Sequence, residues 1–318
     1  MYGISKLTQQ PILILVIATI FWGSNFPLGS DLVSTIPPVL LAFIRWTIAT
    51  LLFFPLVRKE VVAHREGIKH HWKKMSMLSL TSVVGFNTFL YIAVQYTSSI
   101  NASLINSISP IIMVVLTAVF LNEKILKLQY LGIILSTIGV LWVITQGDIT
   151  RIFSLQFNIG DFIVLLAVLS WSGYSVLLKK WGALLPKNTT LFVTLCVGVI
   201  VLMPISIIES FIIPFSIGNI SSLMWAKLLY LGVFPSIISF ICWNRGVMQV
   251  GPAKAANYYH LVVVFASIIA VILGEQYTVH HFIATMIILS GIVVSTNAQL
   301  FKNRSKELRT EERKVKIN

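Results

Sequence analysis

Arg45 is the residue in this 318-residue chain whose position most strongly suggests binding chemistry. It lies well inside the apolar stretch LLAFIRWTIA, and no Asp or Glu lies at a matching depth in any other apolar stretch. A charge buried among apolar helices is costly and must face protein or water. The guanidinium needs backbone carbonyls, hydroxyl or amide side chains, water, or a substrate carboxylate as its partner. Structural anchoring and substrate contact are both open at this point.

Other polar and aromatic side chains recur inside the apolar stretches. Asn87, Tyr91 and Gln95 are spaced four residues apart, so they share one stripe of a helix. The further candidates for a common cavity are Trp22, Asn25, Asn106, Ser107, Trp171, Tyr174, Trp243, Asn244, Asn257, Tyr258 and His260. Any one of them could instead bond between neighbouring helices. Together, an aromatic and amide lining suits a small, moderately polar solute.

Signs of catalysis or of metal binding are absent from the sequence. It has no G-x-S-x-G, H-E-x-x-H, P-loop or dinucleotide-binding motif, so an enzyme is not predicted. The three histidines of residues 58–74 lie among Lys and Arg, which favours a solvated basic loop over a metal site. No metal and no cofactor are predicted. His260 is the histidine that lies deep inside an apolar stretch, and an imidazole can exchange a proton near neutral pH.

The composition places these residues in a membrane. The chain is 56% hydrophobic and 11% charged, and so few charges could not cover the surface of a soluble protein of this size. Much of the net charge of +13 falls in residues 58–74 and 302–316, beside apolar spans. Basic segments in such places set membrane topology and contact anionic lipid, so lipid is a predicted partner and nucleic acid is not.

Ten apolar segments are long enough to cross a bilayer as helices. They cover residues 11–29, 37–57, 75–95, 101–121, 126–145, 159–180, 189–208, 223–245, 252–273 and 278–298. If the N-terminus is cytoplasmic, nearly all Lys and Arg outside these segments fall on the cytoplasmic side. We therefore predict a multi-pass protein of the cell membrane with both termini in the cytoplasm.

The chain also repeats itself at an offset of 152 residues. AVFLNE at 118–123 matches AVILGE at 270–275 in four of six positions, and Gly139 pairs with Gly291 in the same register. Each unit holds five helices, an odd number, so the second enters the membrane from the opposite side. Inverted repeats are typical of secondary transporters, which open a central site to alternate sides. The prediction is an all-α fold of two inverted five-helix repeats, 11–145 and 159–298, between a cytoplasmic N-terminus, 1–10, and a basic tail, 299–318.

Several short motifs occur in order along almost the whole of residues 11–298. They are Trp22-Gly23, Pro38, Arg45-Trp46, the stretch YIAVQYTSSINASLINSISP, and the turns LNEK and LGEQYT. In these motifs the chain resembles the EamA branch of the drug/metabolite transporter superfamily. The resemblance implies a cavity between the halves, lined mainly by the third, fourth, eighth and ninth helices. It also implies export of amino acids or related metabolites, with a multidrug or sugar- or nucleotide-conjugate carrier as the alternative. A membrane enzyme or a non-transporting sensor is the less favoured class.

Two kinds of structural residue complete the predictions. Pro110 removes a helical hydrogen bond and should bend the fourth helix as a hinge, whereas its counterpart Val262 should leave the ninth helix unbent. Glu123 and Glu275 should cap the helices that follow two equivalent turns. The first helix holds no acid, unlike that of small proton-coupled relatives, so passive efflux or exchange fits at least as well as proton coupling. A small-molecule substrate is predicted, and a monomer and a homodimer are both open.

Overall fold

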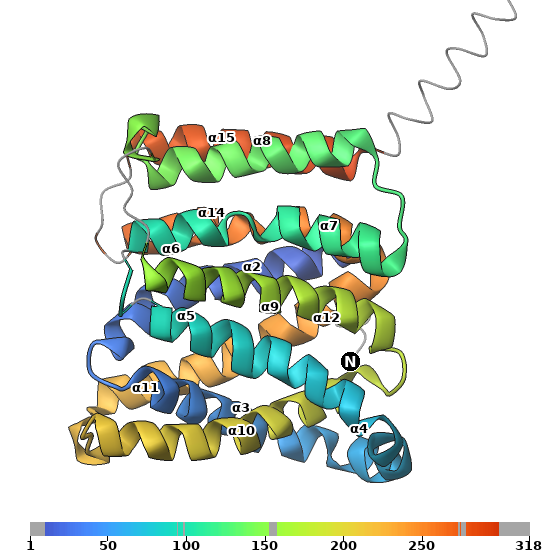
Figure 1. Ribbon diagram of the computed structural model, residues 1–318, viewed down its shortest axis with the longest axis vertical. Coiled ribbons are helices and arrows are strands. Elements are labelled where there is room, and N and C mark those ends of the chain that lie inside the picture. The colour runs from blue at the N-terminus through green and yellow to red at the C-terminus, as the bar shows by residue number, and fades with distance from the viewer. Residues whose placement is uncertain are drawn as a thin grey trace, which may run out of the picture.

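The computed structural model describes residues 10–93, 95–97, 99–152, 158–272, 274 and 278–298. Every regular element within these residues is helical (Figure 1). Ten helical stretches, some of them interrupted, are long and apolar enough to cross a membrane, which confirms the predicted number. Short connections join them, so consecutive stretches run in alternating directions.

The first half consists of α2 (Pro11–Val33), α3 (Pro38–Ala63), α4 (Arg65–Ser79), η1 (Leu80–Phe86), α5 (Asn87–Ala93), α6 (Ser99–Asn106), α7 (Ser109–Leu121) and α8 (Lys127–Ile144). The second half consists of α9 (Ile159–Trp181), α10 (Lys187–Ile212), α11 (Ser222–Leu231), η4 (Gly232–Ile238), α12 (Ser239–Val250), α13 (Pro252–Tyr259), α14 (Leu261–Ile272) and α15 (Val279–Thr296). Two short 3-10 turns, η2 (Ile149–Ile152) and η3 (Ile217–Asn219), lie in connections.

Equivalent irregularities in the two halves confirm the inverted repeat. Both η1 and η4 are seven-residue π-helices, and their first residues, Leu80 and Gly232, are 152 positions apart. The helices α8 and α15 have 18 residues each, and their first residues, Lys127 and Val279, are also 152 positions apart. The offset found in six residues of sequence therefore holds for the helix boundaries themselves.

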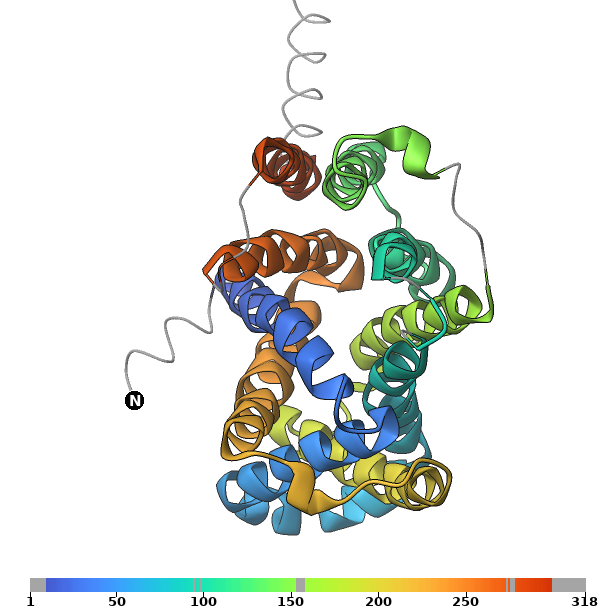
Figure 2. The ribbon, with the colours of Figure 1, turned by 90° about the vertical axis from the view of Figure 1, so that its left-hand side faces the viewer.

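The two halves exchange their first helices. The first-half helix α2 packs against α12 and α14, while the second-half helix α9 packs against α5, α6 and α7. Viewed from one end, these two mixed groups face each other across the middle of the molecule (Figure 2). The pair α3 and α10 closes the molecule below them, and the pair α8 and α15 lies above (Figure 1). A site in the middle is thus built from both halves.

The pair of α8 and α15 depends on two glycines. A Cβ atom built on Gly132 would lie 2.5 Å from the carbonyl oxygen of Gly291, and a Cβ on Gly291 would lie 2.5 Å from the carbonyl oxygen of Gly132. Without side chains the two backbones can touch, which is how helices commonly associate in lipid.

The pair of α3 and α10 is fastened at both ends by a carboxylate. Glu60, near the end of α3, accepts hydrogen bonds from the amide (2.9 Å) and hydroxyl (2.6 Å) of Thr189 in the first turn of α10. Glu209, near the end of α10, accepts from the amides of Val39 (3.1 Å) and Leu40 (2.7 Å) in the first turn of α3. Each carboxylate satisfies N–H groups that a helix start leaves unpaired.

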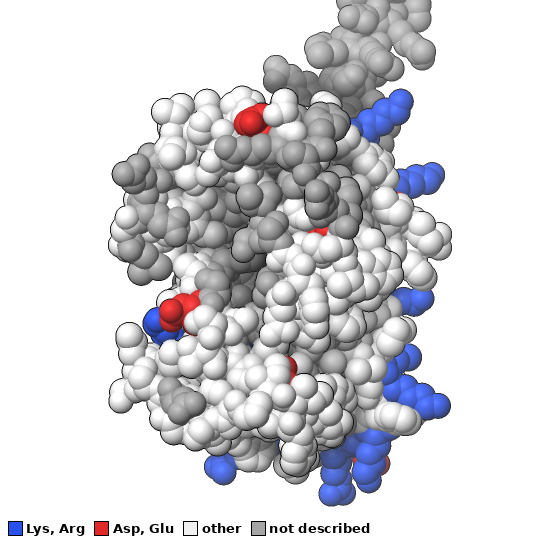
Figure 3. Space-filling view, turned by 60° about the vertical axis from the view of Figure 1, so that its left-hand side comes forward, with Lys and Arg blue, Asp and Glu red and all other residues white. Residues whose placement is uncertain are grey.

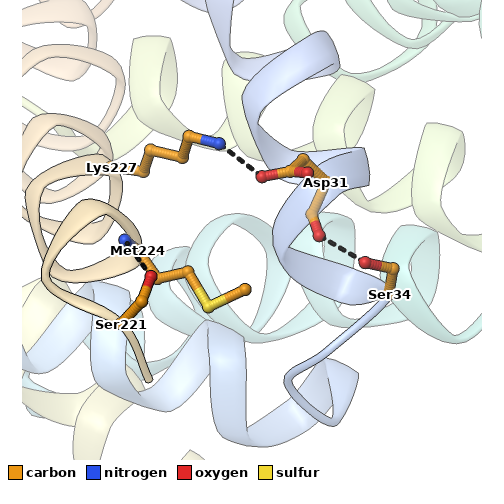
Figure 4. A network of polar contacts seen from close by, with 5 residues as sticks. All are labelled: Asp31, Ser34, Ser221, Met224 and Lys227. Atoms are coloured by element: carbon orange, nitrogen blue, oxygen red, sulfur yellow. Dashed lines mark hydrogen bonds and ion pairs between the residues drawn. The ribbon is translucent and has the colours of Figure 1, made fainter. Parts of the chain in front are cut away.

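The charged residues divide the surface into two faces. Lys and Arg side chains gather on one face, here called the basic face (Figure 3). Its residues include Arg58, Lys59, Lys124, Lys127, Lys179, Lys180, Lys187, Arg245 and Lys254, at the ends of helices that reach this side. On the opposite face, Asp31 of α2 and Lys227 of α11 form an ion pair, with Ser34 and Ser221 bonded to backbone beside it (Figure 4). The opposite face is poor in basic side chains apart from this pair.

Candidate functional site

A small cavity of about 30 Å³ lies between the two mixed groups of helices, and we call it the Arg45 cavity. Its lining residues are Trp22, Asn25, Arg45, Phe86, Asn87, Leu90, Trp171, Phe240, Tyr259 and Val262. They come from both halves of the chain. Five of them, Trp22, Asn25, Arg45, Asn87 and Trp171, are candidates named from the sequence.

Arg45 is held by four neutral partners. Its Nε donates to Ser236 Oγ at 2.7 Å, and its Nη1 donates to Asn25 Oδ1 at 3.1 Å, Asn87 Oδ1 at 3.3 Å and Tyr91 Oη at 3.0 Å. Nη2 makes no hydrogen bond to any described residue. Arg45 therefore joins α2, α3, η4 and α5, and still keeps one donor group at the cavity.

The positive charge of Arg45 is not neutralised by the described part of the chain. Arg45 is 1% exposed and forms no ion pair with any described carboxylate. The ring of Trp46, 5.0 Å from the guanidinium carbon, adds a cation–π contact. A guanidinium stays protonated in proteins, so a full charge remains in a site of low dielectric. Such a site attracts an anion.

The two π-helices position the partners of Arg45. Ser236 lies within η4, and Asn87 follows η1 directly. Pro235 has no N–H to donate within η4, and its carbonyl oxygen accepts the indole N–H of Trp22 at 3.0 Å. π-Helical turns are rare and often occur at functional sites, because the wider turn redirects side chains and frees backbone groups.

Aromatic rings pack beside the Arg45 cavity. The rings of Trp22 and Trp171 meet edge to face with centroids 5.0 Å apart, and Trp243 and Tyr259 contact both of them at 5.3–6.1 Å. Trp171 is 1% exposed, and its buried indole N–H has no hydrogen-bond partner among the described residues. The cavity is thus bordered by rigid apolar rings with an unused donor among them.

A larger cavity of about 150 Å³ adjoins the first, because Tyr259 and Val262 line both. Its remaining lining residues are Ser103, Asn106, Ser107, Ile144, His260, Val263, Ala266 and Ser267. It lies beside α6 and α14, which run toward the opposite face, and that side of the surface is hollowed (Figure 3). On the basic side of the cavity, α7 packs against α13.

The break between α6 and α7 lies at Ser107 and Ile108, just before Pro110. Pro110 occupies the first turn of α7, where the lack of an N–H costs nothing. The proline therefore starts a new helix after the break.

The equivalent helix is also broken, so the expectation that Val262 leaves it unbent is wrong. α13 ends at Tyr259 and α14 begins at Leu261. The side chain of His260, between α13 and α14, stabilises this break. Its Nε2 donates to the Ser107 carbonyl at 3.1 Å, and its Nδ1 lies 2.7 Å from Ser136 Oγ. The bond to Ser107 joins the two helix breaks directly, and the contact with Ser136 ties His260 to α8, so no proline is needed.

Six candidates named from the sequence line neither cavity. One of them, Tyr91, accepts from Arg45. The other five are bonded to residues elsewhere. Tyr174 donates to Asn244 at 2.8 Å, and Trp243 donates to a serine hydroxyl at 3.2 Å. Asn257 bridges Ser136 of α8 and the Gly291 carbonyl of α15, and Tyr258 is bonded to Thr296 of α15. These side chains bond neighbouring helices together.

The turn of Glu123 differs from the prediction. Glu123 lies in residues 122–126, and its carboxylate oxygens are 3.5 and 3.7 Å from the position of a Cβ on Gly251, in the other half. The start of α8 is instead closed by Gln129, whose side chain accepts the amide of Leu126 at 2.8 Å. Gln129 has this role because it is the third residue of α8, from which a side chain can reach back to the amide of the residue before the helix. Glu275 lies outside the described residues.

Some lining residues were missed in the sequence. Tyr259, which lines both cavities, stands between Tyr258 and His260, two residues that were named. Ser236 follows Pro235, and a proline within an apolar span could have drawn attention to its neighbour. Phe86 and Phe240 carry no such signal, because aromatic residues are frequent throughout the chain.

Ten membrane-length helices in two inverted halves around a polar cavity define a membrane transporter. The chain belongs to the EamA-like transporter family, whose model matches residues 9–145 and 158–297.

The chain is also similar to curated transporters, and it shares its fold with a solved structure. The uncharacterized transporter YyaM of Bacillus subtilis is 29% identical over 286 residues, covering 87% of this chain and 90% of its own. An uncharacterized transporter of Archaeoglobus fulgidus is 26% identical, covering 92% and 99% of the two chains. A protein crystal structure with 18% identity superposes with a TM-score of 0.73 over 90% of this chain and 96% of its own, so the two share a fold.

Proposed function

We propose that this protein exports amino acids or related small metabolites across the cell membrane by alternating access. The observation that carries the proposal is Arg45, a buried charge without a carboxylate partner in the described chain, at a cavity between two inverted halves. Its four neutral partners hold the guanidinium in place but leave its charge uncompensated. An uncompensated charge is available to an anionic ligand.

The sidedness of the proposal rests on the basic face. Lys and Arg concentrate on the cytoplasmic side of membrane proteins, so this face is assigned to the cytoplasm together with both termini. The state described then opens outward, since α7 and α13 pack together on the basic side of the cavity.

The alternate state follows from the inverted repeat. Exchanging the conformations of the halves would bring α6 and α14 together and separate α7 from α13. The breaks at Ser107 and His260 divide these helices where such tilting is required. The close pairs α3–α10 and α8–α15 would remain as the static frame.

The size of the site supports small metabolites over the alternative, a sugar- or nucleotide-conjugate carrier. The two adjoining cavities measure about 30 and 150 Å³. That is less than the 300–1,000 Å³ of sites for drug-sized ligands.

The test is flux into liposomes that contain the purified protein, with a panel of labelled amino acids and, in parallel, labelled sugars and cationic drugs. Uptake of one or more amino acids above that of empty liposomes is expected. Asn106→Ala should change the apparent affinity because Asn106 lines the larger cavity, whereas Tyr258→Phe should not. Flux of sugars or drugs alone, or no flux at all, would reject the proposal.

A further inference from the structure

We propose that the Arg45 cavity binds the carboxylate of the transported metabolite, while the body of the ligand occupies the adjoining larger cavity. This inference rests on the proposed function, since it names the chemical class of substrate for the same site. It adds one requirement: a free carboxylate on the ligand.

The hydrogen-bonding groups at the cavity favour an anion. The side-chain oxygens of Asn25, Asn87 and Tyr91 all accept from Nη1 of Arg45 and so point toward the guanidinium. Two donors of lining residues have no partner in the described chain: Nη2 of Arg45, which takes part in none of the hydrogen bonds of its guanidinium, and the buried indole N–H of Trp171. Two free donors and a positive charge match a ligand group that only accepts, as an ionised carboxylate does.

The described chain does not supply that anion itself. The acids on the helices that form the cavity lie at helix ends, where each has another partner. Asp31 pairs with Lys227, Glu60 accepts from Thr189, and Asp161 accepts the hydroxyl of Thr97. The charge of Arg45 is therefore available to a ligand.

The dimensions separate a head group from a body. A water-sized atom needs roughly 10–15 Å³ of such space, so about 30 Å³ accommodates the two oxygens of a carboxylate. Tyr259 and Val262 stand between this cavity and the one of about 150 Å³, whose lining mixes hydroxyl, amide and aliphatic groups. A small organic acid or amino acid with its carboxylate at Arg45 would extend past these two residues.

The first experiment compares matched ligands on the purified protein in nanodiscs. Leucine and leucinamide, phenylalanine and phenylalaninamide, and benzoate and benzamide form pairs that differ in the carboxylate alone. Binding is followed by quenching of tryptophan fluorescence and by thermal stabilisation. Within at least one pair, the carboxylate should bind at least tenfold more tightly than its amide, as expected for charge-assisted hydrogen bonds. Equal affinities within every pair, or no binding by any member, would overturn the carboxylate site.

The second experiment removes one donor at a time. Trp171→Phe deletes the unpartnered N–H of a residue that lines the cavity and keeps most of the ring, so carboxylate affinity should fall about tenfold. Trp142→Phe is the matched control: its indole N–H is also buried without a partner, but it lines neither cavity. Equal effects of the two substitutions would contradict the proposal.

Arg45→Lys should also weaken binding, since an ammonium cannot replace the guanidinium fork. If Arg45→Lys does not fold, the comparison of Trp171→Phe with Trp142→Phe still tests the carboxylate site.

The outcomes distinguish this inference from the proposed function. Selective binding of carboxylates without flux of any amino acid would keep the site and reject amino-acid export. Equal flux of leucine and leucinamide would keep transport and reject the carboxylate site.

Discussion

Glu60 and Glu209 are expected to stabilise one helix pair from its two ends. Glu60→Gln and Glu209→Gln keep the shape of each side chain and one acceptor oxygen, but remove the negative charge. Each native carboxylate makes two hydrogen bonds of 2.6–3.1 Å to the first turn of the partner helix. Losing the charge weakens both bonds and the interaction with the helix dipole, so each variant should lower the free energy of unfolding by about 1–2 kcal/mol.

The two effects should add. Both helices have 26 residues, and the carboxylates lie near opposite ends of the pair, about 30 Å apart at a rise of 1.5 Å per residue. Sites this far apart without shared partners are independent. The double variant should therefore lose about 2–4 kcal/mol.

Unfolding in detergent micelles, by heat or by denaturant, measures these losses. Glu66→Gln is the matched control, because the Glu66 carboxylate is 73% exposed and pairs only with the exposed side chains of Arg65 and Lys69. Surface ion pairs of this kind contribute little, so no resolvable change is expected. A loss in the control as large as in Glu209→Gln would refute the capping argument, as would an unchanged double variant.

Three further predictions concern separate parts of the molecule. Gly291→Ala should lower thermal stability by forcing α15 away from α8, whereas Gly173→Ala, with no atom within 4 Å of its new Cβ, should not. Ser267→Cys, in a background without the native cysteines, should react with a membrane-impermeant maleimide added to intact cells, since Ser267 lines the cavity assigned to the outer side. Absence of labelling would contradict the outward-open assignment. Asp161→Asn should destabilise the start of α9 by about 1–3 kcal/mol in the same unfolding assay, because the buried carboxylate accepts the amide of Asn158 at 2.8 Å. Unchanged unfolding would show that the carboxylate charge is not required there.

The ten helices and their inverted repeat could be predicted from the sequence because both depend on local patterns. Apolar length determines whether a helix can span a bilayer, and two copies of one motif fixed the offset between the halves. Arg45 was found by the same kind of argument, since a charge in an apolar segment is conspicuous in sequence. Its principal partner, Ser236, lies 191 positions away in the other half, and no local pattern joins the two.

The outcome for the polar candidates depends on how each helix is rotated about its axis, which a single sequence does not define. Asn87 and Asn257 are both amides within spans, yet Asn87 lines the Arg45 cavity and Asn257 joins α8 to α15. Packing decides which face of each helix turns inward. The exchange of α2 and α9 between the halves is likewise a property of tertiary packing. The carboxylates Glu60 and Glu209 were overlooked because acids at helix ends usually face solvent.

The binding site is asymmetric, although the frame around it is nearly symmetric. By the alignment of α3 with α10, the position equivalent to Arg45 is Thr194, which is buried and bonded within its own helix. The π-helices are equivalent, yet only η4 supplies a side chain to Arg45. In the proposed alternating access, a nearly symmetric frame would let the halves exchange conformations at similar energy, and a single charge would give the ligand one orientation throughout. If Arg45 binds the carboxylate, the gates on the two faces can alternate while the head group stays at one anchor. Release to either side then depends on breaking the same set of bonds.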